Sequence, residues 1–273
     1  MAGCGRVAAG NARCVIIRQI PDLREGIPDR RELLGPLVRV FDANWMQIEE
    51  YLRRDDRVVL PTGSTEQHGY LSLGTDAILA ERVAAEAAGP LGIPVLPALP
   101  FGMAPYFAAF PGSMSLRITT YIEVLRDLLD GLAAQGFRRI AIVNGHGGNA
   151  PVTGFIREWI CQPRPERVQV LFHSWYNAPQ TAAAADQFDR DQMHGGWVEN
   201  FAWTRVAGVD LPSEPKPVIP RELVGQLDPG QVRAAAPDGM LGGAYARPDP
   251  DMQVVWDAGV AEVRSLLENG WLR

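Results

Sequence analysis

Residues 139–160 read RIAIVNGHGGNAPVTGFIREWI, and this stretch decides the expected fold. The apolar run at 139–143 predicts a buried strand, and 150–160 predicts a helix that follows after a short loop. That loop, NGHGGN at 144–149, places glycines on both sides of His146. A strand, a glycine-rich loop and a helix in direct succession are typical of α/β proteins.

The same alternation continues on both sides of this stretch. Apolar patterning predicts further strands at 57–60, 94–99 and 168–172, and helices at 42–52, 75–88, 119–136, 194–206 and 253–268. Asp42 is expected to cap the first helix, with Trp45, Ile48 and Leu52 on one face. Strands that alternate with helices pair in parallel through crossover connections, so the predicted fold class is α/β with a mostly parallel central sheet.

The periodic pattern begins near Asp42, which divides the chain into two parts. Residues 1–36 are rich in Arg, Gly and Pro without a clear period and are interpreted as an N-terminal extension. Residues 37–273 are expected to form a single domain. Within it, residues 207–250 hold many Pro, Gly and Asp and are expected to wrap the surface.

Composition limits the classes of function. The 273 residues are 47% hydrophobic, enough for a substantial core. The net charge of -6 and the lack of a basic run argue against nucleic acid or an anionic membrane as partner. No apolar stretch approaches the roughly 20 residues of a membrane span. The cysteines form no CxxC pair, which fits free thiols in a reducing cytoplasm.

Candidate functional residues gather in glycine-containing segments at the expected ends of strands and helices. These segments are GSTEQHG at 63–69 with the following TD at 75–76, FPGS at 110–113, NGHGGN at 144–149 and HGGWVE at 194–199. Their titratable residues are Glu66, His68, Asp76, His146, His194 and Glu199. In open α/β sheets ligands bind where the carboxyl ends of the strands meet, so we expect these side chains to converge.

Carboxylates and imidazoles are the ligands that Zn²⁺, Mn²⁺ and Fe²⁺ take in proteins. A pair of such ions needs one bridging carboxylate and a few terminal ligands, and three acids with two histidines meet that need. Three of the four histidines in the chain lie in the glycine-flanked segments. The fourth, His173, is interpreted as a core histidine.

Each segment alone has a simpler interpretation. Glu66 and His68 could be a solvated loop pair, Asp76 or His194 could cap a helix, and Trp197 could be a packing residue. The loop around His146 could also cradle a phosphate through its backbone N–H groups, as in a non-catalytic phosphate-ligand binder. Phosphate sites usually add Lys or Arg, and the loop at 144–149 and the residues directly beside it contain neither. The joint occurrence of the segments favours the metal site.

Taken together, the motifs resemble the creatininase (creatinine amidohydrolase) family. That family shows GSxEQHG followed by TD, FPGT, NGHGGN and HAGExE, and this chain carries their counterparts in the same order over about residues 40–206. The resemblance implies a layered α/β/α fold, two divalent metal ions per chain (Zn, Mn or Fe) and a homo-oligomer, often a hexamer. It implies metal-ligand roles for Glu66, His68, Asp76 as the bridge, His146 and Glu199, and a catalytic role for His194.

The expected function is hydrolysis of the C–N bond of a small cyclic amide by a metal-held hydroxide, since metal binding lowers the pKa of water to about 7. Hydrolysis of a lactone, or of a C–C bond in a cyclic polyol diketone, remains open at the same site. The residues expected to contact substrate are Ser113, Gly147, Gly148, Trp197 and Tyr106. True creatininases carry Tyr-Glu where Gly147 and Gly148 stand, which argues against creatinine as the substrate.

Overall fold

A three-stranded parallel sheet forms the centre of the protein. The computed structural model describes residues 39–272, so the predicted extension at 1–36 lies outside the described residues. The strands are β1 (Arg57–Thr62), β2 (Arg139–Asn144) and β3 (Gln169–Ser174), in the order β1-β2-β3. Both pairings are parallel, and the register aligns the last residues of the strands, Thr62, Asn144 and Ser174.

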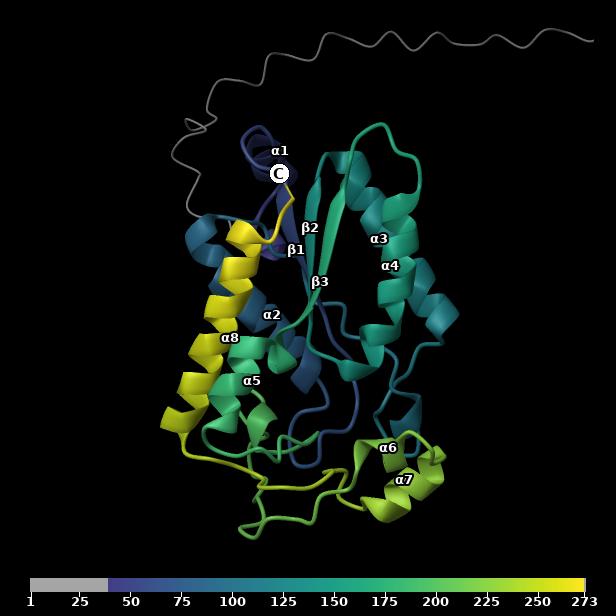
Figure 1. Ribbon diagram of the computed structural model, residues 1–273, viewed down its shortest axis with the longest axis vertical. Coiled ribbons are helices and arrows are strands. Elements are labelled where there is room, and N and C mark those ends of the chain that lie inside the picture. Colours follow the sequence, from purple (N-terminus) through teal and green to yellow (C-terminus); the bar gives the residue numbers. More distant parts are fainter. Residues whose placement is uncertain (1–38, 273) are drawn as a thin grey trace, which may run out of the picture. The chain divides into compact units, whose positions relative to one another are not determined.

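Helices cover both faces of this sheet (Figure 1). One face carries α2 (Thr75–Ala88), α5 (Pro179–Asp186) and α8 (Asp249–Asn269), and the other carries α3 (Ile118–Gln135) and α4 (Thr153–Cys161). The strands alternate accordingly, because successive side chains of a strand point to opposite faces. Val59 and Val143 pack in the cluster of α2 and α8, whereas Leu60 and Ile142 pack in that of α3 and α4. The predicted layered α/β/α fold with parallel strands is confirmed.

The segment at 94–99 was expected to be a strand and is not a regular one. It runs beside β1, where Leu96 N donates to Val59 O at 2.9 Å and Leu99 N donates to Pro61 O at 3.0 Å. Only isolated bridges result. Pro94, Pro97 and Pro100 lack N–H groups, so a continuous ladder cannot form here.

The first helix begins later than expected and has a different cap. Helix α1 (Trp45–Leu52) is capped by Asn44, whose side chain accepts from the N–H groups of Met46 and Gln47. Asp42 instead ends a short 3-10 helix. Trp45 is 71% exposed and lies away from the core, which α1 enters through Tyr51.

The helix predicted at 194–206 is also wrong. Only one 3-10 turn forms there, at Trp197–Glu199. Gly195 takes a left-handed conformation with φ 72°, and Trp197 N donates to Ala244 O at 2.9 Å, outside any helical ladder. Two consecutive glycines lower helix propensity, and tertiary hydrogen bonds replace the helical ones.

Residues 207–250 do more than wrap the surface. They contain α6 (Arg221–Val224) and α7 (Pro229–Ala235), and they bury Val224, Val232 and Leu241 in a small hydrophobic cluster with Phe107 and Met193. The surface interpretation is therefore incomplete. Among residues 39–272, no helix has the length and apolar character needed to cross a bilayer.

Candidate metal centre

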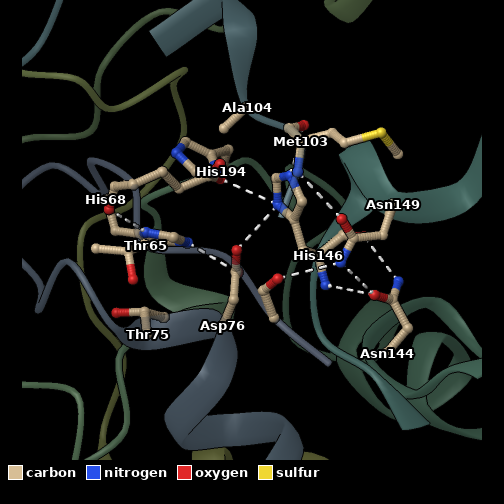
Figure 2. A network of polar contacts seen from close by, with 12 residues as sticks. Thr65, His68, Thr75, Asp76, Met103, Ala104, Asn144, His146, Asn149 and His194 are labelled. Atoms are coloured by element: carbon tan, nitrogen blue, oxygen red, sulfur yellow. Dashed lines mark hydrogen bonds and ion pairs between the residues drawn. The ribbon is translucent and has the colours of Figure 1, made fainter. Parts of the chain in front are cut away.

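The acidic and histidine candidates converge at the carboxyl edge of the sheet. Glu66 and His68 follow β1, Asp76 lies in the first turn of α2, and His146 follows β2. Figure 2 shows His68 and His146 on either side of the Asp76 carboxylate. These side chains lie close together because the strands end in register, so the loops that carry the side chains leave the sheet at the same edge.

Asp76 lies between two groups of possible ligands. Its Oδ1 is 3.0 Å from His68 Nε2, and its Oδ2 is 2.9 Å from His146 Nδ1. Glu66 Oε1 lies 3.2 Å from His146 Nδ1, and Glu199 Oε2 lies 3.9 Å from His68 Nε2. Two triads can therefore be drawn, Glu66–Asp76–His146 and His68–Asp76–Glu199, each with ligand atoms within 4.8 Å of one another. Asp76 is the residue they share.

Hydrogen bonds aim the two histidines at Asp76. His68 Nδ1 lies 3.0 Å from the carbonyl oxygen of Glu66, and His146 Nε2 lies 3.0 Å from that of Met103. A carbonyl oxygen only accepts, so these ring nitrogens carry hydrogen. The remaining nitrogens, which face Asp76, then present lone pairs when the rings are neutral. Metal-binding histidines are oriented by such backbone contacts in proteins.

The burial of these side chains and the hydrogen bonding of their oxygens indicate whether the cluster fits divalent ions. Glu66, His68, Asp76 and His146 are each at most 3% exposed. Glu66 Oε2 is buried without a hydrogen-bond partner, and the buried Asp76 Oδ2 has the ion-pair contact with His146 Nδ1 beside it. Unpaired buried carboxylate oxygens are costly unless a cation lies beside them. The residues present fit a pair of Zn²⁺, Mn²⁺ or Fe²⁺ ions.

The electrostatics of the cluster also indicate a need for positive charge. Burial raises the pKa of Glu66, with a further contribution from Asp76, and burial raises the pKa of Glu199 to about 7. Burial lowers the pKa of His68, but Asp76 and Glu199 outweigh it and raise the value to about 10. In the metal-free protein, protons on the imidazoles therefore balance the carboxylates. Divalent ions would replace these protons.

Two glycines bring α2 close to the strand ends. A Cβ added at Gly63 would lie 2.4 Å from Ala77 N, and one added at Gly145 would lie 2.4 Å from Asp76 O. Both clashes are with backbone, which cannot move as a flexible side chain can. The absence of side chains at these two positions therefore sets the position of Asp76.

Gly145→Ala is expected to lower the free energy of unfolding by roughly 1–3 kcal/mol, the usual cost of overpacking. Gly131→Ala and Gly154→Ala are matched controls, because a Cβ there meets nothing within 4 Å and both glycines lie inside helices. Each control should stabilise the protein by up to about 1 kcal/mol, from helix propensity. Urea denaturation in the presence of a chelator measures all three. Equal stability of Gly145→Ala and the parent would contradict the packing argument.

His194 lies beside the two triads and is held on several sides. Its Nε2 is 2.7 Å from the carbonyl oxygen of Gln67, and its Nδ1 is 3.7 Å from Glu66 Oε1. The ring stacks on Phe107 with centroids 4.5 Å apart and lies 4.4 Å from the ring of His68. Burial, with the charge of His68, holds the pKa of His194 well below its usual value. A third triad, Glu66–His68–His194, is also close enough to hold an ion.

A cavity of about 340 Å³ opens onto this cluster. Tyr106 and Gly147, two of the residues expected to contact substrate, line it together with Glu66, Asp76, His146, His194 and Glu199. His68, at 0% exposure, lies behind Asp76. The metal candidates and the predicted catalytic residue thus share one cavity with part of the predicted substrate contacts.

Three of the expected substrate contacts do not line the cavity. Trp197 is fully buried in the core between the sheet and α8, because the turn at 197–199 points its ring inward. Ser113 Oγ accepts a hydrogen bond from Gln67 N at 2.9 Å and so supports the ligand loop. Gly148 packs under the histidine ring, where a Cβ would lie 2.4 Å from His146 Nε2.

Other lining residues were missed from the sequence. They are Phe107, Tyr176, Asn177, Gln192, Met193, Val198, Val224, Gly225 and Leu241. Tyr176 and Asn177 lie in the 3-10 turn Trp175–Asn177 that follows β3, so the rule that ligands bind at the carboxyl edge could have found them. Val224 and Leu241 come from a segment without periodicity, and no sequence signal marks them.

The sequence of residues 42–267 matches the family described as creatininase, creatinine amidohydrolase. This match covers most of the chain, and the protein belongs to the creatininase family. The predicted family is confirmed.

Several characterised proteins are similar over part of their length. A 3-dehydro-scyllo-inosose hydrolase of Thermotoga maritima is 34% identical over 37% of this chain and 33% of that protein. A creatinine amidohydrolase of Pseudomonas putida is 32% identical over 41% and 46%, respectively. A mycofactocin precursor peptide peptidase of Mycolicibacterium smegmatis is 38% identical over 34% and 40%. The matched stretch therefore spans less than half the length of each of these relatives.

Solved structures share the fold. A crystal structure of creatinine amidohydrolase superposes with a TM-score of 0.69 over 88% of this chain and 100% of that chain, at 22% identity. Other creatininase structures are described as a Zn-Zn type and as a manganese form. At this identity the likeness establishes the fold alone.

Proposed function

We propose that the protein is a metal-dependent amidohydrolase that cleaves the C–N bond of a small cyclic amide. The observation that carries the proposal is the position of Asp76, whose two carboxylate oxygens face two different histidines. One carboxylate shared by two buried triads is the arrangement expected for a bridged pair of ions. The proposed ligands are Glu66, His68, Asp76, His146 and Glu199, with Asp76 as the bridge.

A bound pair of divalent ions would supply a nucleophile from water near neutral pH and polarise the substrate carbonyl. The chain itself supplies proton transfer. His194 Nε2 lies 2.7 Å from the carbonyl oxygen of Gln67 and 3.0 Å from the side-chain Nε2 of the same residue, and the shorter carbonyl contact favours a proton on His194 Nε2. The other ring nitrogen, Nδ1, lies 3.7 Å from Glu66 Oε1. His194 Nδ1 can accept a proton and pass it to the leaving nitrogen, the usual task of a general acid–base group.

The nearest rival keeps the site and changes the bond that is cleaved. The similarity to a 3-dehydro-scyllo-inosose hydrolase favours a cyclic polyol ketone as the second candidate substrate. A lactone is a third possibility at the same site. The phosphate-binding alternative through the His146 loop is weakened, because no described side chain lining the cavity is Lys or Arg. A screen of cyclic amides, lactones and cyclic diketones with the metal-reconstituted protein separates these candidates.

Purified protein is expected to hold close to two divalent ions per chain after reconstitution. The reason is the pair of triads that share the buried Asp76, whose carboxylates need positive charge. Elemental analysis after gel filtration measures the ratio. Protein that holds no metal after reconstitution with Zn²⁺ and Mn²⁺ would contradict the proposal.

Creatinine is expected to be a poor substrate. Gly147 and Gly148 stand where true creatininases carry Tyr-Glu. The contacts around Gly148 leave no room for a side chain, because a Cβ there would lie 2.1 Å from Met103 O. A creatinine turnover assay on metal-reconstituted protein tests this. Turnover at rates usual for enzymes, about 1–1,000 per second, would instead assign the activity that names the family.

We further propose that the protein is a cytoplasmic homo-oligomer, in which a hexamer is the expected size. The proposal rests on the family resemblance and on the cysteine pattern. Light scattering coupled to gel filtration measures the mass of the assembly.

A further inference from the structure

The cavity beside the metal centre carries two kinds of lining. Carboxylates and imidazoles line the part around Asp76. Another part is formed by Phe107, Met193, Val224 and Leu241, which belong to one hydrophobic cluster and are named here the apolar wall. The apolar wall therefore forms a continuous patch within the same cavity as the proposed ligands.

Backbone contacts fix the apolar wall to the site. Leu241 N donates to the carbonyl oxygen of His194 at 3.1 Å, and Ile219 N donates to that of Leu241 at 2.8 Å. Behind the wall, Val232 of α7 is 1% exposed, and Arg233 Nη1 donates to Ala109 O at 2.7 Å. The wall is thus held against both the loop of His194 and the loop of Phe107, as expected of a preformed binding surface.

The absence of charged side chains around the apolar wall, among the described residues other than the proposed ligands, limits which chemical groups of a substrate can bind there. Away from the proposed ligands and His194, the polar side chains lining the cavity are Tyr106, Tyr176, Asn177 and Gln192, all neutral. No described lining side chain is Lys or Arg. A carboxylate or phosphate on the substrate, at a distance from the metal centre, would have no cationic partner. Hydroxyl groups against the apolar wall would lose their hydrogen bonds to water without replacement.

Building on the proposed function, we infer that the substrate is a neutral cyclic amide with an apolar substituent, and that this substituent packs on Val224 and Leu241. The amide then faces the metal centre while a branched alkyl or aryl group occupies the apolar wall. A cyclic polyol fits this cavity less well, because the hydroxyl groups that it turns toward the apolar wall would meet only hydrocarbon, whatever the others find among the neutral polar side chains.

Three hydantoins test the inference on the metal-reconstituted protein: hydantoin, 5-isopropylhydantoin and hydantoin-5-acetic acid. We expect kcat/KM for 5-isopropylhydantoin to exceed that for hydantoin by at least about 10-fold, the usual value of a buried apolar group in a specificity pocket. The acetic acid derivative should react more slowly than hydantoin. Equal or reversed preference for the isopropyl compound would overturn the inference, as would a preference for the acid.

A matched pair of variants assigns the effect to the wall. Val224→Thr places a hydroxyl in the wall without changing its volume and should reduce the isopropyl preference by roughly 10-fold. Val209→Thr makes the same change at a position that is 43% exposed and should leave the preference unaltered. An unchanged preference in Val224→Thr would overturn the assignment to this wall.

The failure of the proposed function can be distinguished from the failure of this inference. If none of the hydantoins is hydrolysed, amide hydrolysis is contradicted, and calorimetry with the same three compounds still measures their binding. Tighter binding of 5-isopropylhydantoin than of hydantoin, lost in Val224→Thr, would support the apolar wall by itself. Binding without preference would overturn it.

Discussion

Replacing Asp76 with Ala is expected to release both metal ions and abolish hydrolysis. The reason is that Asp76 is the residue shared by the triads Glu66–Asp76–His146 and His68–Asp76–Glu199. Glu66→Ala and Glu199→Ala each remove a carboxylate from only one of these triads and should weaken mainly one ion. Activity of Asp76→Ala should fall more than about 1,000-fold, since loss of a single preorganised charge stabiliser already costs ~10²–10³.

Asp127→Ala is the matched control for this variant. Asp127 lies on an exposed position of helix α3, so its removal should change neither metal content nor activity. Elemental analysis and turnover are measured on the same preparations, with circular dichroism as a check of folding. Equal and mild metal loss from Asp76→Ala, Glu66→Ala and Glu199→Ala would mean that Asp76 is not the bridge.

The second large effect is expected for His194→Ala, which should retain both metal ions. Its kcat should fall by about 100- to 10,000-fold, because that is the usual contribution of a general acid–base group. Its Nδ1 lies 3.7 Å from Glu66 Oε1, further than the nitrogens of His68 and His146 lie from Asp76. His194 also packs on Phe107, so some loss of stability is expected as well.

Three measurements on His194→Ala distinguish its possible roles. A catalytic role predicts normal metal content and a low kcat below the melting temperature. A purely structural role predicts a lowered melting temperature with nearly normal turnover at low temperature. Loss of one ion would make His194 a ligand, as the triad Glu66–His68–His194 allows.

The sheet and most helices could be predicted because their signals are local. The apolar runs of β1 and β2 and the spacing of leucines in α3 need no knowledge of distant residues. The failures at 94–99 and 194–206 have different causes, local in the first segment and partly non-local in the second. In the first, prolines interrupt pairing with β1, and in the second, contacts with 241–244 replace helical hydrogen bonds.

The convergence of Glu66, His68, Asp76 and His146 could be predicted for a different reason. Parallel strands align their carboxyl ends, so the segments that follow β1 and β2 leave the sheet at the same edge and their residues start close together. The direction of a single ring could not be predicted in this way. Trp197 turns into the core because its loop is shaped by Gly195 and by Ala244, neither of which leaves a periodic signal.

The alignment of strand ends has a consequence for how the chain folds. The Thr62 hydroxyl meets the Asn144 side chain at 3.1 Å, across a sequence separation of 82 residues. The ligands that follow β1 approach His146, which follows β2, only after the two strands have paired. This pairing costs the entropy of closing a long loop. Unfolded chains thus have no preassembled chelate. Any ion that binds the native cluster adds its binding free energy to the stability of the whole domain.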